Sequence, residues 1–172
     1  MANESPLFDL DQHRTALHDY FAAQPNVIVA YLFGSHARGQ AHWHSDIDIA
    51  ILHEPGLSSD ASLDLRLDVI DELMGLLASN DVDVIVLNQA PLALAYRVLR
   101  DGIVLFCRDA QTRILYQADT VSRYLDFKPF IERHEKAILE RARKGELLYG
   151  YNPHRNALAD YRQLREKLDS IP

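Results

Sequence analysis

Residues 27–52 read VIVAYLFGSHARGQAHWHSDIDIAIL, and this stretch decides the fold. It begins with an apolar run that ends at a glycine, which is typical of a buried strand followed by a turn. It closes on DIDIAIL (46–52), where isoleucines alternate with polar or small residues, as in a strand with two different faces. The sequence therefore predicts two strands joined by a polar loop, with candidate metal ligands where the loop meets the second strand.

Two sets of possible metal ligands compete for this loop. His42, His44 and Asp46 begin like the H-x-H-x-D pattern of a zinc hydrolase, whereas Asp46 and Asp48 form a pair of carboxylates. A zinc hydrolase of that kind needs another histidine directly after the aspartate, and Ile47 stands there. The remaining histidines lie in no recognisable metal motif. Because Mg²⁺ prefers oxygen ligands, we expect a magnesium site on Asp46 and Asp48.

A third aspartate is expected to join this pair. Residues two apart on a strand point the same way, so Asp46 and Asp48 project from one face about 7 Å apart at Cα. Asp83 lies in the run VDVIVL (82–87), which reads as a further strand. If the two strands are neighbours, Asp83 completes a cluster of three carboxylates. Asp81, two residues earlier on the same face, is the competing residue.

The turn after the first strand offers groups that suit a phosphate. Gly34 lets the backbone approach a ligand closely, and Ser35 adds a hydroxyl to the N–H groups of the turn. Arg38 lies one turn further on and suits a phosphate oxygen. A P-loop is excluded, because GSHARGQ (34–40) lacks the terminal G-K-[ST] of that motif.

The rest of the chain up to residue 108 continues an α/β alternation. Capping residues, apolar stripes at helical spacing and short apolar runs indicate the further elements. We expect a helix after Asp9 or Asp11 that ends at Pro25, a helix from Ser62 to about residue 77, a short helix from Pro91 to about Leu99, and a strand over 102–107.

From Asp109 onward the pattern is helical and more charged. Pro129 predicts either two helices or one kinked helix, and a last polar helix is expected to reach about Leu168. We therefore expect two parts, residues 1–108 as the α/β domain and residues 109–172 as a helical C-terminal extension.

Composition and charge narrow the class of protein. The chain has 172 residues, is 48% hydrophobic and 25% charged, and has a net charge of −7. Without a block of basic residues, direct binding of nucleic acid is not expected. The single Cys107 excludes an internal disulfide, and no apolar run approaches membrane-spanning length. These features predict a cytoplasmic protein that does not enter a membrane.

Gly34-Ser35, ten further residues and then Asp46-Ile47-Asp48 match the G-S-x(10)-D-x-D signature of the polymerase-β-type nucleotidyltransferases. The longer pattern resembles the minimal nucleotidyltransferase (MNT) branch, in particular the MntA-type antitoxins encoded beside HEPN ribonuclease toxins. The resemblance covers residues 10–108 well and the tail loosely. It implies an α/β (α+β) fold, with a nucleotidyltransferase-like mixed β-sheet flanked by helices and a C-terminal helical extension.

The resemblance also implies an activity. In that family an adenylyltransferase, with two Mg²⁺ ions, transfers AMP from ATP to a tyrosine of the HEPN toxin and thereby neutralises it. We expect a complex with a cognate toxin, as a hetero-oligomer. Carried over to this sequence, the metal-binding and catalytic residues would be Asp46, Asp48 and Asp83, and the nucleotide-binding residues Gly34, Ser35, Arg38 and Ser45.

Two alternatives of other classes remain open. A small-molecule nucleotidyltransferase, of the aminoglycoside-modifying type, would use the same core with a deep acceptor pocket. A non-catalytic antitoxin would neutralise its partner by binding alone, but Ser35, Asp46 and Asp48 are all present, which argues against loss of activity. An adjacent gene for a small helical protein with an R-x(4–6)-H motif would favour the adenylyltransferase.

Overall fold

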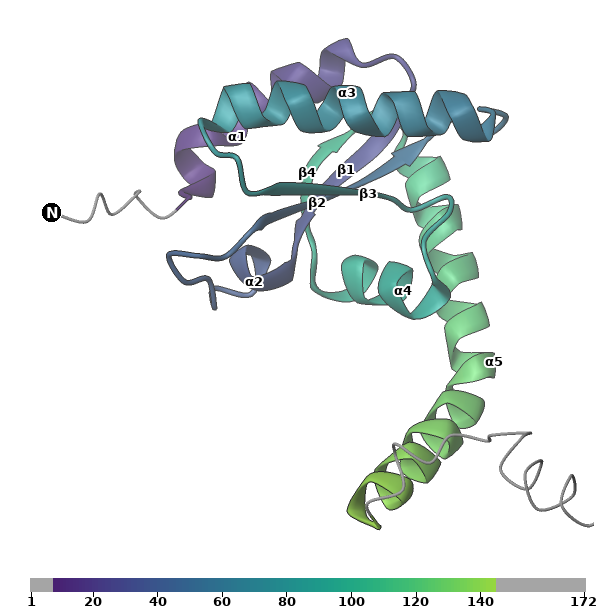
Figure 1. The fold of residues 1–172 in the computed structure, drawn as a ribbon. Coiled ribbons are helices and arrows are strands. Elements are labelled where there is room, and N and C mark those ends of the chain that lie inside the picture. Colours follow the sequence, from purple (N-terminus) through teal and green to yellow (C-terminus); the bar gives the residue numbers. More distant parts are fainter. Residues whose placement is uncertain (1–7, 145–172) are drawn as a thin grey trace, which may run out of the picture. The chain divides into compact units, whose positions relative to one another are not determined.

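A computed structural model describes residues 8–144 of the chain (Figure 1). Helices and strands alternate through residues 10–107, as the sequence predicts. In chain order the elements are α1 (Leu10–Ala23), β1 (Val27–Phe33), α2 (Gly34–Ala37), β2 (Ile47–His53), α3 (Ser59–Leu77), β3 (Val82–Val86), α4 (Leu92–Asp101), β4 (Ile103–Cys107) and α5 (Ala110–Arg143).

The four strands form one mixed sheet in the order β3-β2-β1-β4. The central strand β1 is antiparallel to both of its neighbours, whereas β2 and β3 run parallel. The parallel pair is possible because the long helix α3 connects the end of β2 to the start of β3. The predicted mixed sheet flanked by helices is confirmed.

Both faces of the sheet are covered, which explains why β1 is apolar throughout. The three isoleucines of β2 (Ile47, Ile49 and Ile51) pack in one core with buried side chains of α1 and α3. Ala50 and Leu52 of the same strand pack in a second core with α4. Figure 1 shows α1 and α3 over one face of the sheet and α4 against the other. The alternation in DIDIAIL therefore places Asp48 on the α4 side.

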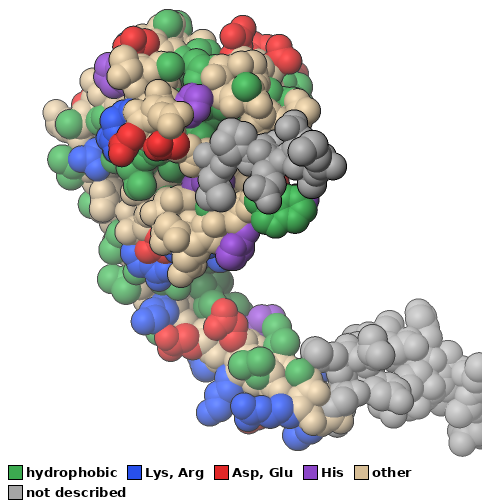
Figure 2. Space-filling model, turned by 90° about the vertical axis from the view of Figure 1, so that its left-hand side faces the viewer, with side chains coloured by type: hydrophobic (Ala, Val, Ile, Leu, Met, Phe, Trp, Pro, Cys, Tyr) green, Lys and Arg blue, Asp and Glu red, His purple; other side chains and the backbone are tan. Residues whose placement is uncertain are grey.

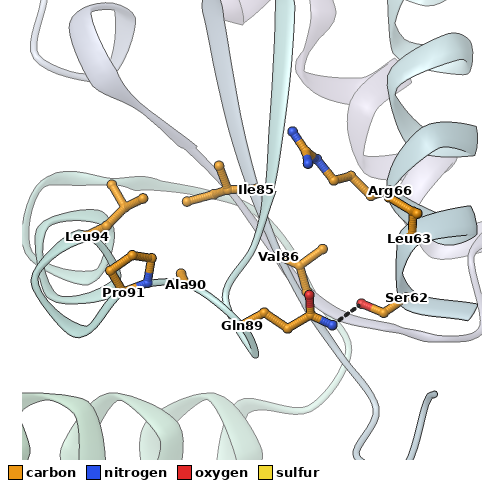
Figure 3. A pocket seen from close by; sticks show the side chains of 9 residues that line it. All are labelled: Ser62, Leu63, Arg66, Ile85, Val86, Gln89, Ala90, Pro91 and Leu94. Carbon is orange, nitrogen blue, oxygen red and sulfur yellow. Dashed lines mark hydrogen bonds between the residues drawn. The ribbon is translucent and has the colours of Figure 1, made fainter. Parts of the chain in front are cut away.

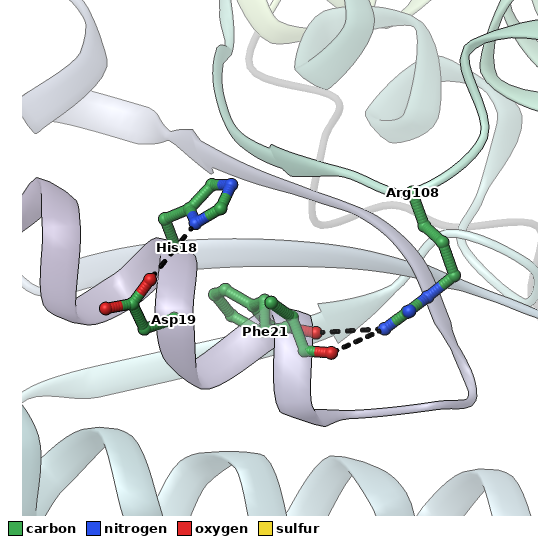
Figure 4. Close-up of polar contacts among 5 residues, drawn as sticks. His18, Asp19, Phe21 and Arg108 are labelled. Atoms are coloured by element: carbon green, nitrogen blue, oxygen red, sulfur yellow. Dashed lines mark hydrogen bonds and ion pairs between the residues drawn. The ribbon is translucent and has the colours of Figure 1, made fainter.

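Helix α1 is fixed at both ends by side chains. Asp9 caps its start and accepts a hydrogen bond of 3.0 Å from the backbone N–H of Asp11, as predicted. At the other end Arg108, which directly follows β4, donates to the carbonyl oxygens of Ala22 and Gln24 at 3.0 and 2.8 Å. Figure 4 shows this guanidinium against the last turn of α1. A cation here satisfies free carbonyl groups and complements the helix dipole.

Helix α3 begins earlier than the sequence predicts. The predicted start is Ser62, but the helix begins at Ser59, and Ser58 is the cap that accepts a hydrogen bond from Ala61 N–H at 3.2 Å. Ser62 is instead 1% exposed and lies inside the first turn. Local spacing could not separate these positions, because either serine is a good cap for the apolar stripe that follows.

A buried polar network joins Ser62 to the end of β2. His53, 4% exposed, contacts the carbonyl oxygen of Glu54 through Nδ1 at 2.7 Å and the hydroxyl of Ser62 through Nε2 at 3.0 Å. Because a carbonyl only accepts, Nδ1 carries the proton, so Nε2 accepts from Ser62. The Ser62 oxygen in turn accepts from Gln89 at 3.1 Å. Each polar side chain of this network therefore has a hydrogen-bond partner.

Replacing His53 with Leu should therefore destabilise the fold. The substitution leaves the buried Ser62 hydroxyl and the Glu54 carbonyl without this partner, which typically costs about 1–3 kcal/mol in the free energy of unfolding. Urea unfolding of the purified variant measures the loss. His18→Leu, at a solvent-exposed histidine of α1, is the matched control and should stay close to wild type. Equal stability of both variants would contradict a structural role for the network.

The last described helix, α5, runs through Pro129 as a single helix, so separate helices do not occur there. Its first part packs on the sheet domain, where the Tyr116 hydroxyl donates to the Leu87 carbonyl at 2.8 Å. The chain divides into two compact units, residues 1–126 and 127–172. The assignment of residues 1–108 to one domain and 109–172 to an extension stays a prediction, and the helix expected near Leu168 lies outside the described residues.

Exposed side chains of both charges are interspersed with apolar ones on the surface (Figure 2). Among the described helices, none is long and apolar enough to cross a membrane.

Candidate active site

The turn that follows β1 brings Gly34 against Asp48. Phe33, the last residue of β1, pairs with Asp48 of β2, so the next residue of the turn lies beside the Asp48 side chain. Gly34 has a φ of +73°, and a Cβ at this position would overlap the Asp48 carboxylate. Glycine is therefore required twice here, for the backbone conformation and for space. The contact brings the two halves of the predicted signature together.

Asp83 lies directly opposite Asp48. In the parallel pairing of β2 with β3, Asp48 is the register partner of Asp83, and Asp46 comes immediately before β2. Asp81 precedes β3 and instead accepts the backbone N–H of Ile47 through its carbonyl at 2.8 Å. Of the two candidates for the third carboxylate, Asp83 is thus the one beside the pair.

The charges of these carboxylates act on one another. Burial raises the pKa of the Asp48 carboxyl above its usual range, and the negative charges of Asp83 and Asp46 raise it further. The positive charges of His36 and Arg38 oppose this shift. A half-buried carboxylate facing two others is a place where a cation lowers the electrostatic energy, so the oxygen ligands present suit Mg²⁺.

The three carboxylates do not yet form a closed cluster. Among residues 8–144, no three histidine, cysteine or acidic side chains lie close enough together to hold a metal ion. Asp83 is engaged by Arg66 of α3, whose Nη2 lies 3.4 Å from the carboxylate oxygen Oδ1. Nothing in the sequence marks Arg66 as a site residue, because it occupies an ordinary polar position on α3 and belongs to no motif.

The residues predicted to bind a nucleotide differ in the contacts that they make near the carboxylates. Ser35 follows Gly34 in the short helix α2, and its carbonyl accepts from Gln40 N–H at 2.9 Å, which closes the turn. Arg38 donates from Nε to the Gln40 side chain at 3.4 Å, and its charge reaches Asp48. Ser45 is already engaged, since its hydroxyl accepts from the backbone N–H of His42 at 2.8 Å.

His36 of α2 and His44 of the loop between α2 and β2 make contacts that support the shape of this loop. His36 contacts the carbonyl of Ser45 through Nε2 at 3.2 Å, which connects α2 to the end of the loop. The rings of Trp43 and His44 lie against each other with centroids 3.2 Å apart, and Trp43 is 69% exposed. These contacts place the histidine side chains around the loop before the carboxylates.

A cavity of about 240 Å³ lies beyond Asp83, between α3, β3 and the start of α4. Figure 3 shows the residues that line it, with Arg66 reaching from α3 toward the strand and Gln89 bonded to Ser62. Apart from Arg66 the lining contains no charged side chain. None of the residues predicted from the signature lines this cavity, so it is separate from the turn at Gly34.

Comparison with known proteins finds a matching family profile and a similar protein. A sequence profile described as "Polymerase beta, Nucleotidyltransferase" matches residues 15–111. The protein adenylyltransferase MntA of Shewanella oneidensis is 31% identical in an alignment of 132 positions, and the match covers 72% of this chain and 88% of that protein.

Two solved structures are similar to this one in fold. A crystal structure of a toxin–antitoxin with AMP-PNP is 28% identical with a TM-score of 0.60, and the match covers 75% of this chain and 98% of that one. The toxin–antitoxin MntA-HepT is 26% identical with a TM-score of 0.55, and the match covers 75% of this chain and 96% of that one. The similarity therefore extends beyond the residues that the sequence profile matches.

Proposed function

This chain belongs to the polymerase-β-type nucleotidyltransferases, as its G-S-x(10)-D-x-D signature predicts, and from that premise we propose that it is a protein adenylyltransferase. The proposed reaction transfers AMP from ATP to a tyrosine of a cognate HEPN ribonuclease toxin in the cytoplasm, which neutralises the toxin. The MntA relative is itself a protein adenylyltransferase, and two similar structures are toxin–antitoxin structures, one of them with AMP-PNP.

The observation that carries the proposal is the contact between Gly34 and Asp48, with Asp83 opposite. The turn places the backbone of Gly34, which has no side chain of its own, beside the carboxylate of Asp48. The register partner of Asp48 is a second aspartate, Asp83. A nucleotide phosphate is bound by N–H donors and by a cation. The turn at Gly34 offers backbone N–H groups to the phosphate, and the adjacent carboxylate of Asp48 offers oxygen ligands to the cation.

Asp46, Asp48 and Asp83 would hold two Mg²⁺ ions, which when bound neutralise phosphate charge and lower the pKa of the acceptor hydroxyl. The backbone at Gly34 and the Ser35 hydroxyl orient the triphosphate. The reaction joins the tyrosine oxygen to the α-phosphorus, breaks the bond to the β-phosphate, and releases pyrophosphate and a proton.

Arg38 and Ser45 have supporting parts in this proposal. The charge of Arg38 reaches Asp48, so the same guanidinium is close enough to the carboxylates to pair with a phosphate oxygen once ATP is bound. Ser45 holds the loop directly before Asp46 by accepting from His42 N–H. We therefore assign Ser45 an indirect contribution to the nucleotide site through the shape of this loop.

The surface of this chain suits a protein as the acceptor of AMP better than a small molecule such as an aminoglycoside. Apolar side chains are exposed on the part of α5 that belongs to the unit of residues 1–126, namely Ile114 at 56%, Leu115 at 62% and Leu125 at 54%, and such residues are typical of a docking surface. The net charge of −7 favours encounter with a partner that has a basic, RNA-binding surface.

Intact-mass spectrometry of the partner tests the proposal. Incubating this chain, ATP and Mg²⁺ with the small helical protein encoded beside it should add one or more adenylyl groups to that partner. The Asp48→Asn variant is the matched control and should leave the mass unchanged. An unmodified partner together with ready modification of an aminoglycoside would replace this proposal with the small-molecule enzyme. Neutralisation without any change in mass would indicate an antitoxin that acts by binding alone.

A further inference from the structure

Arg66 makes two contacts that together fix the third carboxylate. Its Nε donates to the carbonyl oxygen of Val84 at 2.6 Å, and its Nη2 donates to Oδ1 of Asp83 at 3.4 Å. Both acceptors belong to neighbouring residues of β3, and the guanidinium reaches them from α3 (Figure 3). Because the guanidinium is a rigid planar fork, anchoring one N–H group on the backbone determines where the other lies.

The anchored guanidinium of Arg66 competes with a metal ion for the carboxylate of Asp83. Neighbouring strands lie about 4.8 Å apart, so register partners such as Asp48 and Asp83 can converge on one ion. In the described part of the chain no three acidic, histidine or cysteine side chains are grouped closely enough to do so. Asp83 is instead paired with Arg66, at a site where the two side chains are 52% and 41% exposed.

We propose that Arg66 is a positioning residue that pairs with the Asp83 carboxylate in the metal-free protein and releases this carboxylate when a divalent cation binds. The inference rests on the proposed function, since it concerns the same carboxylates. Binding of the ion then exchanges one ionic partner of Asp83 for another, and Arg66 keeps its hydrogen bond to Val84.

The test is the affinity for Mn²⁺, measured by electron paramagnetic resonance without nucleotide or partner. Arg66→Gln should bind Mn²⁺ about fivefold more tightly than wild type, because an exposed ion pair that must be broken is worth up to about 1 kcal/mol. In an Asp83→Asn background the same change at Arg66 should have no effect, since the carboxylate it acts through is absent. If Arg66→Gln does not fold, Arg66→Met retains the aliphatic stem and serves the same comparison.

The possible results distinguish a failure of the proposed role of Arg66 from a failure of the proposed metal site. Unchanged affinity in Arg66→Gln, with binding in wild type that Asp48→Asn removes, would overturn the role of Arg66 and leave the proposed metal site intact. Equal tightening by Arg66→Gln in the wild-type and Asp83→Asn backgrounds would show that only the charge of Arg66 acts at a distance, and would also overturn it. No Mn²⁺ binding that depends on Asp48 in wild type would overturn both.

Discussion

Asp48→Asn is expected to reduce AMP transfer by about three orders of magnitude while the free protein becomes more stable to heat at neutral pH. Transfer falls because the substitution removes a charged ligand at the point where β1, α2 and β2 meet. Stability rises because burial and the charges of Asp83 and Asp46 raise the pKa of Asp48, so its ionised form is unfavourable in the fold. Asparagine has the same shape without the charge.

The pH dependence of this gain has a defined sign. A carboxyl whose pKa is raised by folding costs no stability below its ordinary value of 3.8, where it is protonated in both states. The cost develops as pH rises through the raised pKa and is complete above it. Calorimetry with EDTA should therefore find a higher Tm for Asp48→Asn at pH 7, and the difference should vanish below about pH 3.8. A higher Tm that persists at low pH would contradict this origin.

Asp81→Asn is the matched control for the loss of transfer. This aspartate lies two residues before Asp83, but it precedes β3 and is not the register partner of Asp48. Its substitution should leave transfer close to wild type. Transfer at the wild-type rate in Asp48→Asn with Mg²⁺, or an equal loss in Asp81→Asn, would refute the assignment of the carboxylates.

Gly34→Val is expected to eliminate measurable ATP binding and to destabilise the fold. A β-branched side chain is strained at a φ of +73°, which costs about 1–3 kcal/mol. Its Cβ would also overlap the Asp48 carboxylate, so either the turn or the carboxylate must move. Because the proposal uses the backbone of this turn for the phosphates and Asp48 for the metal, both halves of the site are displaced. Titration with a fluorescent ATP analogue measures the effect.

Gly56→Val separates strain from site geometry. Gly56 has a φ of +96°, but a Cβ there meets no atom within 4 Å. The control should lose only the stability that the backbone strain costs, and it should still bind ATP. Ser35→Ala, which keeps the backbone of the turn, should weaken ATP binding without unfolding. ATP binding by Gly34→Val that matches wild type would show that the triphosphate lies elsewhere.

The sequence by itself determined the elements and the first half of the site. Helical stripes, the Asp9 cap and the alternation in DIDIAIL depend on residues within a few positions of one another, and each survives in the structure. The contact between Gly34 and Asp48 comes from the observed pairing, because two antiparallel strands joined by one loop bring the end of the first to the start of the second.

Only the tertiary structure decided which carboxylate faces Asp48 and what holds it. Asp81 and Asp83 are two residues apart, so the sequence pattern places both on the same face of a strand. In the observed register between β2 and β3, Asp83 is the one that lies opposite Asp48. Arg66 acquires its position because α3 packs beside β3 and places it within reach of residues 17 and 18 positions away. Periodicity is encoded locally, whereas register and ion pairing follow from how whole strands and helices pack, so no pattern of a few residues contains them.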